Sequence, residues 1–211
     1  MMEQLMITLV IALGSMMTLL LLVHIAMMMM MTREKTSDPC IFMRDATNSW
    51  IEQAKLADND GAAFDFFGWS VGIYGNTVIV GALSSESGHV YVRDGENNWT
   101  AQAKLVANDE GAYDSFDTSV GIYGDTAIIG ASNDDDNGSF TGSAYVFVRD
   151  GNNDWSEQTK LVANAGAAFD YFGHSVGIYG NTAIVGAPSY TVGVNSGSAY
   201  VFFQYEVSDI R

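Results

Sequence analysis

SVGIYG, at Ser70–Gly75, recurs at Ser119–Gly124 and Ser175–Gly180. Each copy leads into a second apolar run that ends in Gly-Ala. These runs are Asn76–Ala82, Asp125–Ala131 and Asn181–Ala187. The first serines stand at 70, 119 and 175, so the copies are 49 and then 56 residues apart, and the chain is a repeat protein. We expect five of the seven extra residues in the loop after Ala131 and two in the strand Ala144–Val148.

Each unit is expected to contain four strands. A W-x-x-Q-x-K-L motif with period-two alternation stands ahead of each SVGIYG block, at Trp50–Leu56, Trp99–Leu105 and Trp155–Leu161. Runs rich in aromatic and β-branched residues close the units, at His89–Val92, Ala144–Val148 and Ala199–Phe203. The Gly-Asn and Gly-Asp pairs after the blocks predict type II′ hairpins. The sequence therefore predicts an all-β fold, an incomplete β-propeller of about three four-stranded antiparallel blades.

These units resemble the FG-GAP repeats of integrin alpha-chain β-propellers. The FG element is present at Phe67-Gly68 and Phe172-Gly173, whereas the middle unit has Phe116-Asp117. The GAP element is complete only at its last occurrence; its three forms are Gly81-Ala82-Leu83, Gly130-Ala131-Ser132 and Gly186-Ala187-Pro188. The calcium loop of integrin-type units has no counterpart in these short hairpins. The resemblance implies ligand binding or adhesion through loops on one face.

The N-terminal segment predicts a membrane anchor. From Leu5 to Met31 there is no charged side chain, and this stretch exceeds the roughly 20 residues that cross a bilayer as a helix. A cleaved signal peptide is the alternative. Arg33 and Lys35 favour a cytoplasmic placement of the repeats. The sequons that begin at Asn98 and Asn137 are candidate glycosylation sites and favour the extracellular or lumenal side, which we predict.

The predicted organisation follows from these features. It comprises an anchor, or uncleaved signal anchor, over 1–35, a linker with a remnant strand (Ile41–Arg44) over 36–49, repeats over 50–205 and a tail over 206–211. The repeat units are 50–98, 99–154 and 155–205. The net charge of −16 argues against nucleic-acid binding and favours cations or basic partners. Cys40 is the only cysteine, which excludes an internal disulfide.

The sequence predicts no enzyme and no cofactor. Ser70 and Ser175 lie in G-x-S-x-G motifs, but a strand that enters a hairpin is not the strand-turn-helix of a hydrolase nucleophile. His89, which we align with Ser143 and Ser198, does not stand at metal-ligand spacing from His174 or from His24. Weak surface calcium binding is the most that we expect from the acidic segments, which are Asn133/Asp135/Asn137/Gly138, Asp58/Asp60/Asp65 and Asp109/Glu110/Asp114.

The leading hypothesis is a non-enzymatic, membrane-anchored surface protein that presents its repeats for recognition or adhesion. A protein or a glycan is the expected ligand. The aromatic residues Phe64, Phe66, Tyr113, Tyr171 and Tyr190 are candidates to line a ligand face, but packing in the core or between blades is the role that we favour for them. Three blades leave two open edges, because propellers use about 4–8. The alternative hypothesis is therefore a structural or truncated propeller fragment that forms homo-oligomers and has no ligand of its own.

Overall fold

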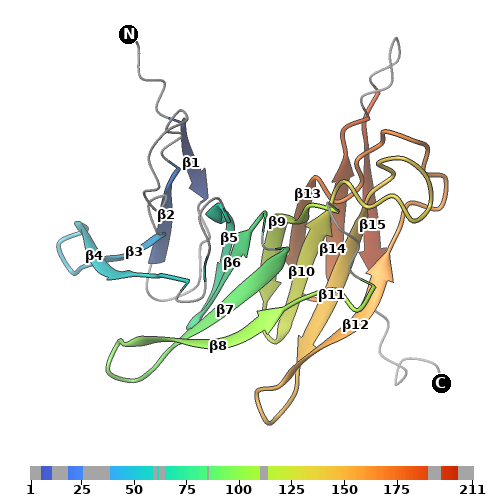
Figure 1. Ribbon diagram of the computed structural model, residues 1–211. Coiled ribbons are helices and arrows are strands. Elements are labelled where there is room, and N and C mark those ends of the chain that lie inside the picture. Colours follow the sequence, from blue (N-terminus) through green and yellow to red (C-terminus); the bar gives the residue numbers. More distant parts are fainter. Residues whose placement is uncertain are drawn as a thin grey trace, which may run out of the picture.

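A computed structural model describes residues 6–10, 19–25, 39–58, 61, 65–84, 86–109, 114–189 and 196–203. All regular elements in these residues are strands, arranged in four antiparallel sheets that follow one another along the chain (Figure 1). Sheet I contains β1 (Met6–Val10), β2 (Leu19–Ile25), β3 (Cys40–Arg44) and β4 (Trp50–Lys55); sheet II contains β5 (Phe67–Tyr74), β6 (Thr77–Ala82), β7 (Ser87–Arg93) and β8 (Trp99–Leu105). Sheet III contains β9 (Phe116–Tyr123), β10 (Thr126–Ala131), β11 (Ser143–Arg149) and β12 (Trp155–Leu161); sheet IV contains β13 (Ser175–Tyr179), β14 (Thr182–Ala187) and β15 (Ser198–Phe203). The predicted all-β fold of blade-like sheets is confirmed.

The sheets are offset by one strand from the repeats read in the sequence. Each Trp strand is the outer strand of the sheet before it, because β4 pairs with β3, β8 with β7 and β12 with β11. One sequence repeat thus completes one sheet and supplies three strands to the next. The predicted remnant Ile41–Arg44 is accordingly part of β3, a full member of sheet I.

The predicted membrane anchor overlaps two described segments. Both segments, β1 and β2, are strands rather than helix, and they pair antiparallel with each other. The remaining residues of the predicted anchor lie outside the described ones, so the spanning helix stays a prediction. Among the described residues, no helix is long and apolar enough to cross a bilayer.

The turns follow from local sequence. Gly75, Gly124 and Gly180 have φ values of 58°, 59° and 55°, whereas the residue after each glycine has no positive φ, as the predicted type II′ turns require. At the other hairpins, an aspartate holds the turn through its side chain. Asp94 Oδ1, for example, accepts hydrogen bonds of 2.8 Å from the amides of both Glu96 and Asn98. Hydrogen bonds of this kind hold the pKa of Asp94 below its ordinary value.

The extra residues of the middle repeat all lie in one loop. β7 and β11 pair with β6 and β10 in the same register, from Ser87 opposite Ala82 and from Ser143 opposite Ala131. The predicted two-residue extension of the strand is therefore wrong, and residues 132–142 take up the whole difference from residues 83–86. The same register corrects the alignment of His89, which occupies the position of Tyr145 and not that of Ser143.

The FG and GA motifs are where neighbouring sheets meet. Ser70 Oγ of sheet II donates to the main-chain oxygen of Asp117 in sheet III, at 2.9 Å. Ser119 Oγ donates in the same way to Gly173 O, at 2.8 Å. A Cβ atom on Gly130 would lie 1.9 Å from Gly173 O, so the glycine of the GA pair admits the FG segment of the next sheet. The serine of SVGIYG thereby joins consecutive sheets.

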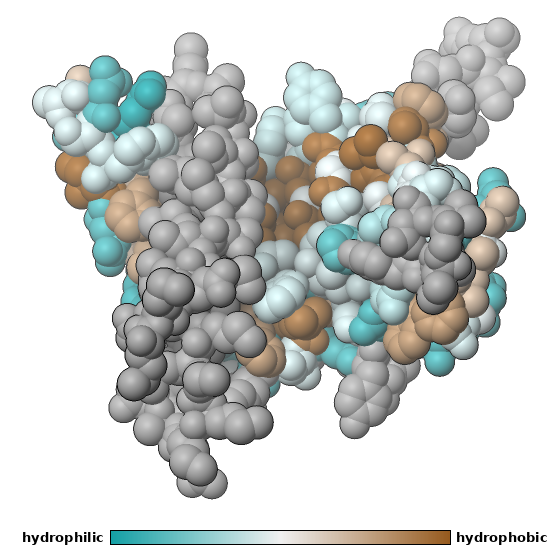
Figure 2. Space-filling view, turned by 90° about the horizontal axis from the view of Figure 1, so that it is seen from above, coloured by the Kyte–Doolittle hydropathy of each residue, from teal (hydrophilic) through white to brown (hydrophobic). Residues whose placement is uncertain are grey.

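The first strands of sheets II to IV, β5, β9 and β13, lie side by side, since β9 contacts both of the others. Tyr74, Tyr123 and Tyr179 form a ladder along them, with ring centroids 4.6 and 4.9 Å apart. Between the sheets, apolar clusters form the core. The cluster between sheets II and III, for example, includes Ile79, Val90, Phe116 and Tyr145. Figure 2 shows hydrophobic residues in the middle of this face of the molecule and at parts of its edge, with hydrophilic residues mainly around them.

Candidate ligand-binding face

One end of the sheets carries the FG segments and is here called the FG face. It consists of the segments that lead into β5, β9 and β13, together with the β6–β7 and β10–β11 loops. The hairpins 94–98 and 150–154 lie at the opposite end (Figure 1). Because β5 and β9 begin at Phe67 and Phe116, equivalent positions of successive repeats come together on this face.

The FG face contains a pocket of about 360 Å³. Three consecutive repeats contribute to it, and the residue before the serine of SVGIYG does so each time. The lining residues are Trp69, Leu83, Ser115, Thr118, Ser132, Asn133, Tyr171 and His174. None of them is Asp, Glu, Lys or Arg, although the chain carries 25 acidic residues. The pocket therefore combines aromatic walls with uncharged polar groups.

Hydrogen bonds fix the polar wall of this pocket. Thr118 Oγ1 donates to Ser115 O at 2.7 Å and lies 3.0 Å from Ser132 Oγ. Asn133 Nδ2 donates to Ser115 Oγ at 2.7 Å. Since these side chains hold one another, their remaining donor and acceptor positions have defined directions for a ligand.

Exposed aromatic rings surround the pocket. Trp69 is 39 % exposed and makes an edge contact with Phe66 at 6.2 Å between ring centroids. Tyr171 stacks on Phe140 at 5.6 Å, with an interplanar angle of 12°. Phe66 and Tyr171, for which packing was the favoured role, are half-buried and lie on this face; Phe64, Tyr113 and Tyr190 lie outside the described residues. Trp69 and Phe140 were missed, although the position of Trp69 beside Ser70 is a usable signal.

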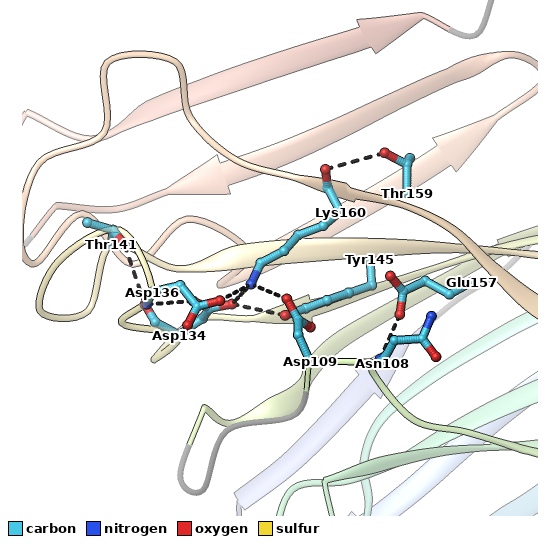
Figure 3. Close-up of polar contacts among 9 residues, drawn as sticks. All are labelled: Asn108, Asp109, Asp134, Asp136, Thr141, Tyr145, Glu157, Thr159 and Lys160. Carbon is cyan, nitrogen blue, oxygen red and sulfur yellow. Dashed lines mark hydrogen bonds and ion pairs between the residues drawn. The ribbon is translucent and has the colours of Figure 1, made fainter.

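An ion cluster lies farther out on the same end of the sheets. Lys160 Nζ contacts carboxylate oxygens of Asp109, Asp134 and Asp136 at 2.8, 2.7 and 2.7 Å (Figure 3). Tyr145 donates its hydroxyl to Asp134 at 3.0 Å, and its ring lies 5.1 Å from Lys160 Nζ. Asp109 follows β8, whereas the other members belong to sheet III, so the cluster joins sheets II and III. The inserted loop 132–142 supplies Asp134 and Asp136.

The charges in this cluster stabilise one another. Burial opposes ionisation of the almost fully buried Asp134, yet its contacts with the Lys160 ammonium group and the Asp136 amide outweigh burial and hold its pKa below the ordinary value. The pKa of Asp109 is lowered as well, chiefly through the Lys160 hydrogen bond acting against burial. For Lys160, the contacts with Asp109, Asp134 and Asp136 overcome desolvation and raise the pKa. The ammonium group thus occupies the place where the three carboxylates converge.

Among the predicted calcium residues, Asp109 belongs to this cluster, whereas Asn133, Asp135 and Asn137 of the inserted loop do not. Asn133 lines the pocket of the FG face, while Asp135 and Asn137 are exposed. Within the described part of the chain, no three His, Cys, Asp or Glu side chains are placed to hold a metal ion. Sequence reasoning selected Asn133, Asp135, Asn137 and Gly138 in this loop, whereas Asp134 and Asp136 form the cluster.

The contacts of Ser70, Ser87 and His89 are structural. Ser70 of the first G-x-S-x-G motif is committed to the Asp117 carbonyl. Ser87 Oγ lies 3.0 Å from His89 Nε2, and Asp58 Oδ2 lies 3.7 Å from the same nitrogen. A Ser-His-Asp relay needs the acid on the other ring nitrogen, so these contacts are not that of a catalytic triad.

Asp117 is an anomaly of the middle repeat. It has φ = 80° at the position where Gly68 and Gly173 have 92° and 91°. The side chain is fully buried, and neither carboxylate oxygen makes a hydrogen bond of normal geometry. Burial raises the pKa of Asp117 well above its ordinary value. The departure from the FG pattern thus places a strained, buried acid between sheets II and III.

The candidate glycosylation residues are both exposed, and they lie at opposite ends of the sheets. Asn98 belongs to the β7–β8 hairpin, where its Nδ2 donates to Asp94 at 3.1 Å. Asn137 belongs to the inserted loop of the FG face.

Comparison with known proteins supports the division of the chain into three repeats. The sequence profile of the FG-GAP repeat matches residues 50–93, 99–147 and 155–202, more than half of the chain. The chain belongs to the FG-GAP repeat family. No curated protein sequence matches it. A solved structure of a luciferin-regenerating enzyme is similar, with a TM-score of 0.48, 8 % identity and 87 % of this chain covered. The chain spans 57 % of that structure's length. The matched FG-GAP repeats and the successive antiparallel sheets together indicate a β-propeller-like domain whose motif residues lie between sheets.

Proposed function

We propose that this chain is a non-enzymatic, membrane-anchored surface protein whose FG face binds neutral carbohydrate. The observation that carries the proposal is the uncharged pocket of about 360 Å³ that three successive repeats line with aromatic, hydroxyl and amide side chains. Its volume lies at the small end of the 300–1,000 Å³ of ligand sites, which suits one sugar ring or a chain end.

Each part of the pocket matches a part of a sugar. The exposed faces of Trp69 and Tyr171 suit the apolar C–H face of a pyranose. The Thr118, Ser132 and Asn133 groups suit its hydroxyls, because they both donate and accept hydrogen bonds. The net charge of −16 disfavours anionic sugars and phosphorylated ligands.

The test is titration of the full-length protein with neutral mono- and oligosaccharides, followed by tryptophan fluorescence and calorimetry. Trp69→Ala is expected to weaken binding at least tenfold. Trp50→Ala is the matched control, because Trp50 is similarly exposed (40 % against 39 %) but begins β4 at the other end of its sheet. Equal losses in the two variants, or no binding of any neutral sugar at millimolar concentration, would refute the proposal. Recovery of the unchanged sugar by NMR tests the absence of turnover.

The surface location has its own test. Both sequons are expected to carry glycans in a eukaryotic host, and carbonate extraction is expected to leave the chain in the membrane fraction. Removal of Asn98 and Asn137 one at a time identifies the modified residue by the loss of one mobility step. Unmodified Asn98 and Asn137, or release of the chain by carbonate, would contradict this placement.

A further inference from the structure

Sheet IV has a face that no described residue covers. Ile184 and Val201, which are paired across β14 and β15, are 47 % and 52 % exposed there. The register makes Ile184 equivalent to Ile79 and Ile128, both 0 % exposed. The bare face consists of Ser175, Gly177, Tyr179, Thr182, Ile184, Gly186, Ala199, Val201 and Phe203.

The same face of sheets II and III shows what covers it. The next sheet places Phe116 in the cluster of Ile79, and Phe172 in the cluster of Ile128. It also supplies the carbonyl that accepts the hydrogen bond of Ser70 or Ser119. Ser175 is the equivalent serine, and among the described residues no such carbonyl faces it. The bare face thus has the side chains of an internal contact.

Charge distinguishes this face from the rest of the molecule. From Tyr171 to Phe203 the sequence contains no Asp, Glu, Lys or Arg, although the whole chain has a net charge of −16. Two copies of the chain repel each other wherever their acidic surfaces meet. At sheet IV, two copies can approach without bringing like charges together.

We propose that the bare face of sheet IV is the contact with a second copy of this chain, related by a twofold axis that passes near Ile184. A second copy has no free FG strand to offer, because its β5, β9 and β13 already pack against sheets I, II and III through Phe67, Phe116 and Phe172. The partner surface in that copy is then the same uncharged face, which is self-complementary in a twofold arrangement. This interface is independent of any ligand at the FG face.

The area of the bare face sets the expected affinity of the dimer. Three strands about 4.8 Å apart and six residues of about 3.3 Å each give roughly 300 Å² in the plane of the sheet. This falls short of the about 800 Å² per partner of a standard interface. We therefore expect a weak dimer, with a dissociation constant of about 10 μM or higher, that a shared membrane would favour by concentrating the copies.

The first test is the mass of the full chain in mild detergent, by sedimentation over a concentration range from about 1 μM to about 1 mM, which spans the expected dissociation constant. A monomer-dimer equilibrium is expected. Val201→Glu is expected to abolish the dimer and to keep the circular dichroism of the parent, because Val201 is half exposed. Ile51→Glu is the matched control, at 49 % exposure on β4, and should leave the dimer unchanged. A monomer at every concentration, or equal effects of both substitutions, would overturn the proposal.

The second test locates the contact in cell membranes without detergent. Ile184→Cys is expected to form a 184–184 product with a short bismaleimide, since packed sheets lie about 10 Å apart. Adding Val201→Glu should remove this product, and Ile51→Cys should give no 51–51 product. Native Cys40 lies on sheet I, so a 184–40 product identified by mass spectrometry would show a head-to-tail arrangement and overturn the twofold interface.

Discussion

The hydroxyl of Ser119 donates a 2.8 Å hydrogen bond to the main-chain oxygen of Gly173, which lies 54 residues later in the chain. This bond joins sheet III to sheet IV, and the bond from Ser70 to Asp117 joins sheet II to sheet III in the same way. The most regular block of the sequence therefore has a direct structural role, because its serine holds the FG segment of the following sheet.

Removal of this hydroxyl is expected to weaken the contact. Ser119→Ala should lower the free energy of unfolding by about 1–2 kcal/mol, because it leaves a carbonyl between the sheets without its donor. Ser175→Ala is the control, since its hydroxyl has no equivalent acceptor in the described residues, and should change stability by less than about 0.5 kcal/mol. Urea unfolding followed by tryptophan fluorescence measures both. Equal changes would show that the serine acts within its own strand and not between sheets.

Asp117→Gly is expected to stabilise the protein by about 1–3 kcal/mol at neutral pH, because it removes a non-glycine residue at φ = 80° and a buried acid. The raised pKa of Asp117 adds a pH dependence. The proton is retained longer in the folded state, so stability is full below the unfolded-state value of about 4 and falls as the pH rises toward the folded-state value.

Asp117→Asn separates the two effects, because it keeps the backbone strain and cannot ionise. We expect it to remove this fall of stability with pH and to stabilise less than Asp117→Gly does. Thermal unfolding between pH 4 and pH 8 measures both variants. If stability falls with pH as steeply in both variants as in the parent protein, Asp117 does not titrate in this range.

Lys160→Met is expected to destabilise the protein by about 2–4 kcal/mol at pH 7, because it leaves Asp109, Asp134 and Asp136 together without a cation. The lowered pKa values of Asp109 and Asp134 give the sign of the pH effect. Their contribution is present above the ordinary carboxylate pKa and is lost as the pH falls through the folded-state values. The stability lost through Lys160→Met should therefore be smaller near pH 3 than at pH 7.

Lys104→Met is the control for Lys160, since Lys104 holds the equivalent place on β8 and is exposed. It should change stability by less than about 0.5 kcal/mol. Urea unfolding at pH 7 and pH 3 compares the two substitutions. A loss for Lys160→Met that is the same at both pH values would assign it to lost packing on Tyr145.

Gly130→Ala is expected to cost at least about 3 kcal/mol, because its methyl group would overlap Gly173 O, at 1.9 Å, and would force sheets III and IV apart. Gly151→Ala is the control, because a Cβ there meets no atom within 4 Å. Thermal unfolding and protease resistance of the two variants provide the comparison. A mild effect at Gly130 would mean that the sheets move apart without loss of the fold.

The sequence was sufficient to predict the strands of the repeats, because period-two alternation and the Gly-Asn and Gly-Asp turns are local properties, whereas β1 and β2 lie where a helix was predicted. It could not assign Trp50, Trp99 and Trp155 to a sheet, since each strand can pair with the strand before it or after it, and only the packing decides. The two added strand residues predicted at Ala144–Val148 were misplaced for a related reason. Ser87 and Ser143 are both short polar residues, and only the register with β6 and β10 shows that they are equivalent.

The candidate site was predicted in part. Tyr171 and Phe66 are conspicuous in the sequence as aromatic residues near the FG motif, but the sequence favoured packing over ligand contact for them. Lys160 was missed because its partners come from positions 51, 26 and 24 residues before it, and nothing local marks such a contact. The pairing of Trp69 and His174 in one pocket likewise depends on three repeats lying side by side.

The one-strand offset between repeat and sheet bears on how such a chain changes in length during evolution. A tandem duplication from one Trp strand to the next inserts one outer strand and three following strands, so it finishes the sheet already begun and starts another. Each copied segment therefore pairs through its first strand with the sheet of the segment before it. Gain or loss of one repeat by recombination therefore adds or removes the equivalent of one sheet and leaves the strand content of the other sheets unchanged. A break at a sheet boundary would instead cut through the duplicated sequence unit.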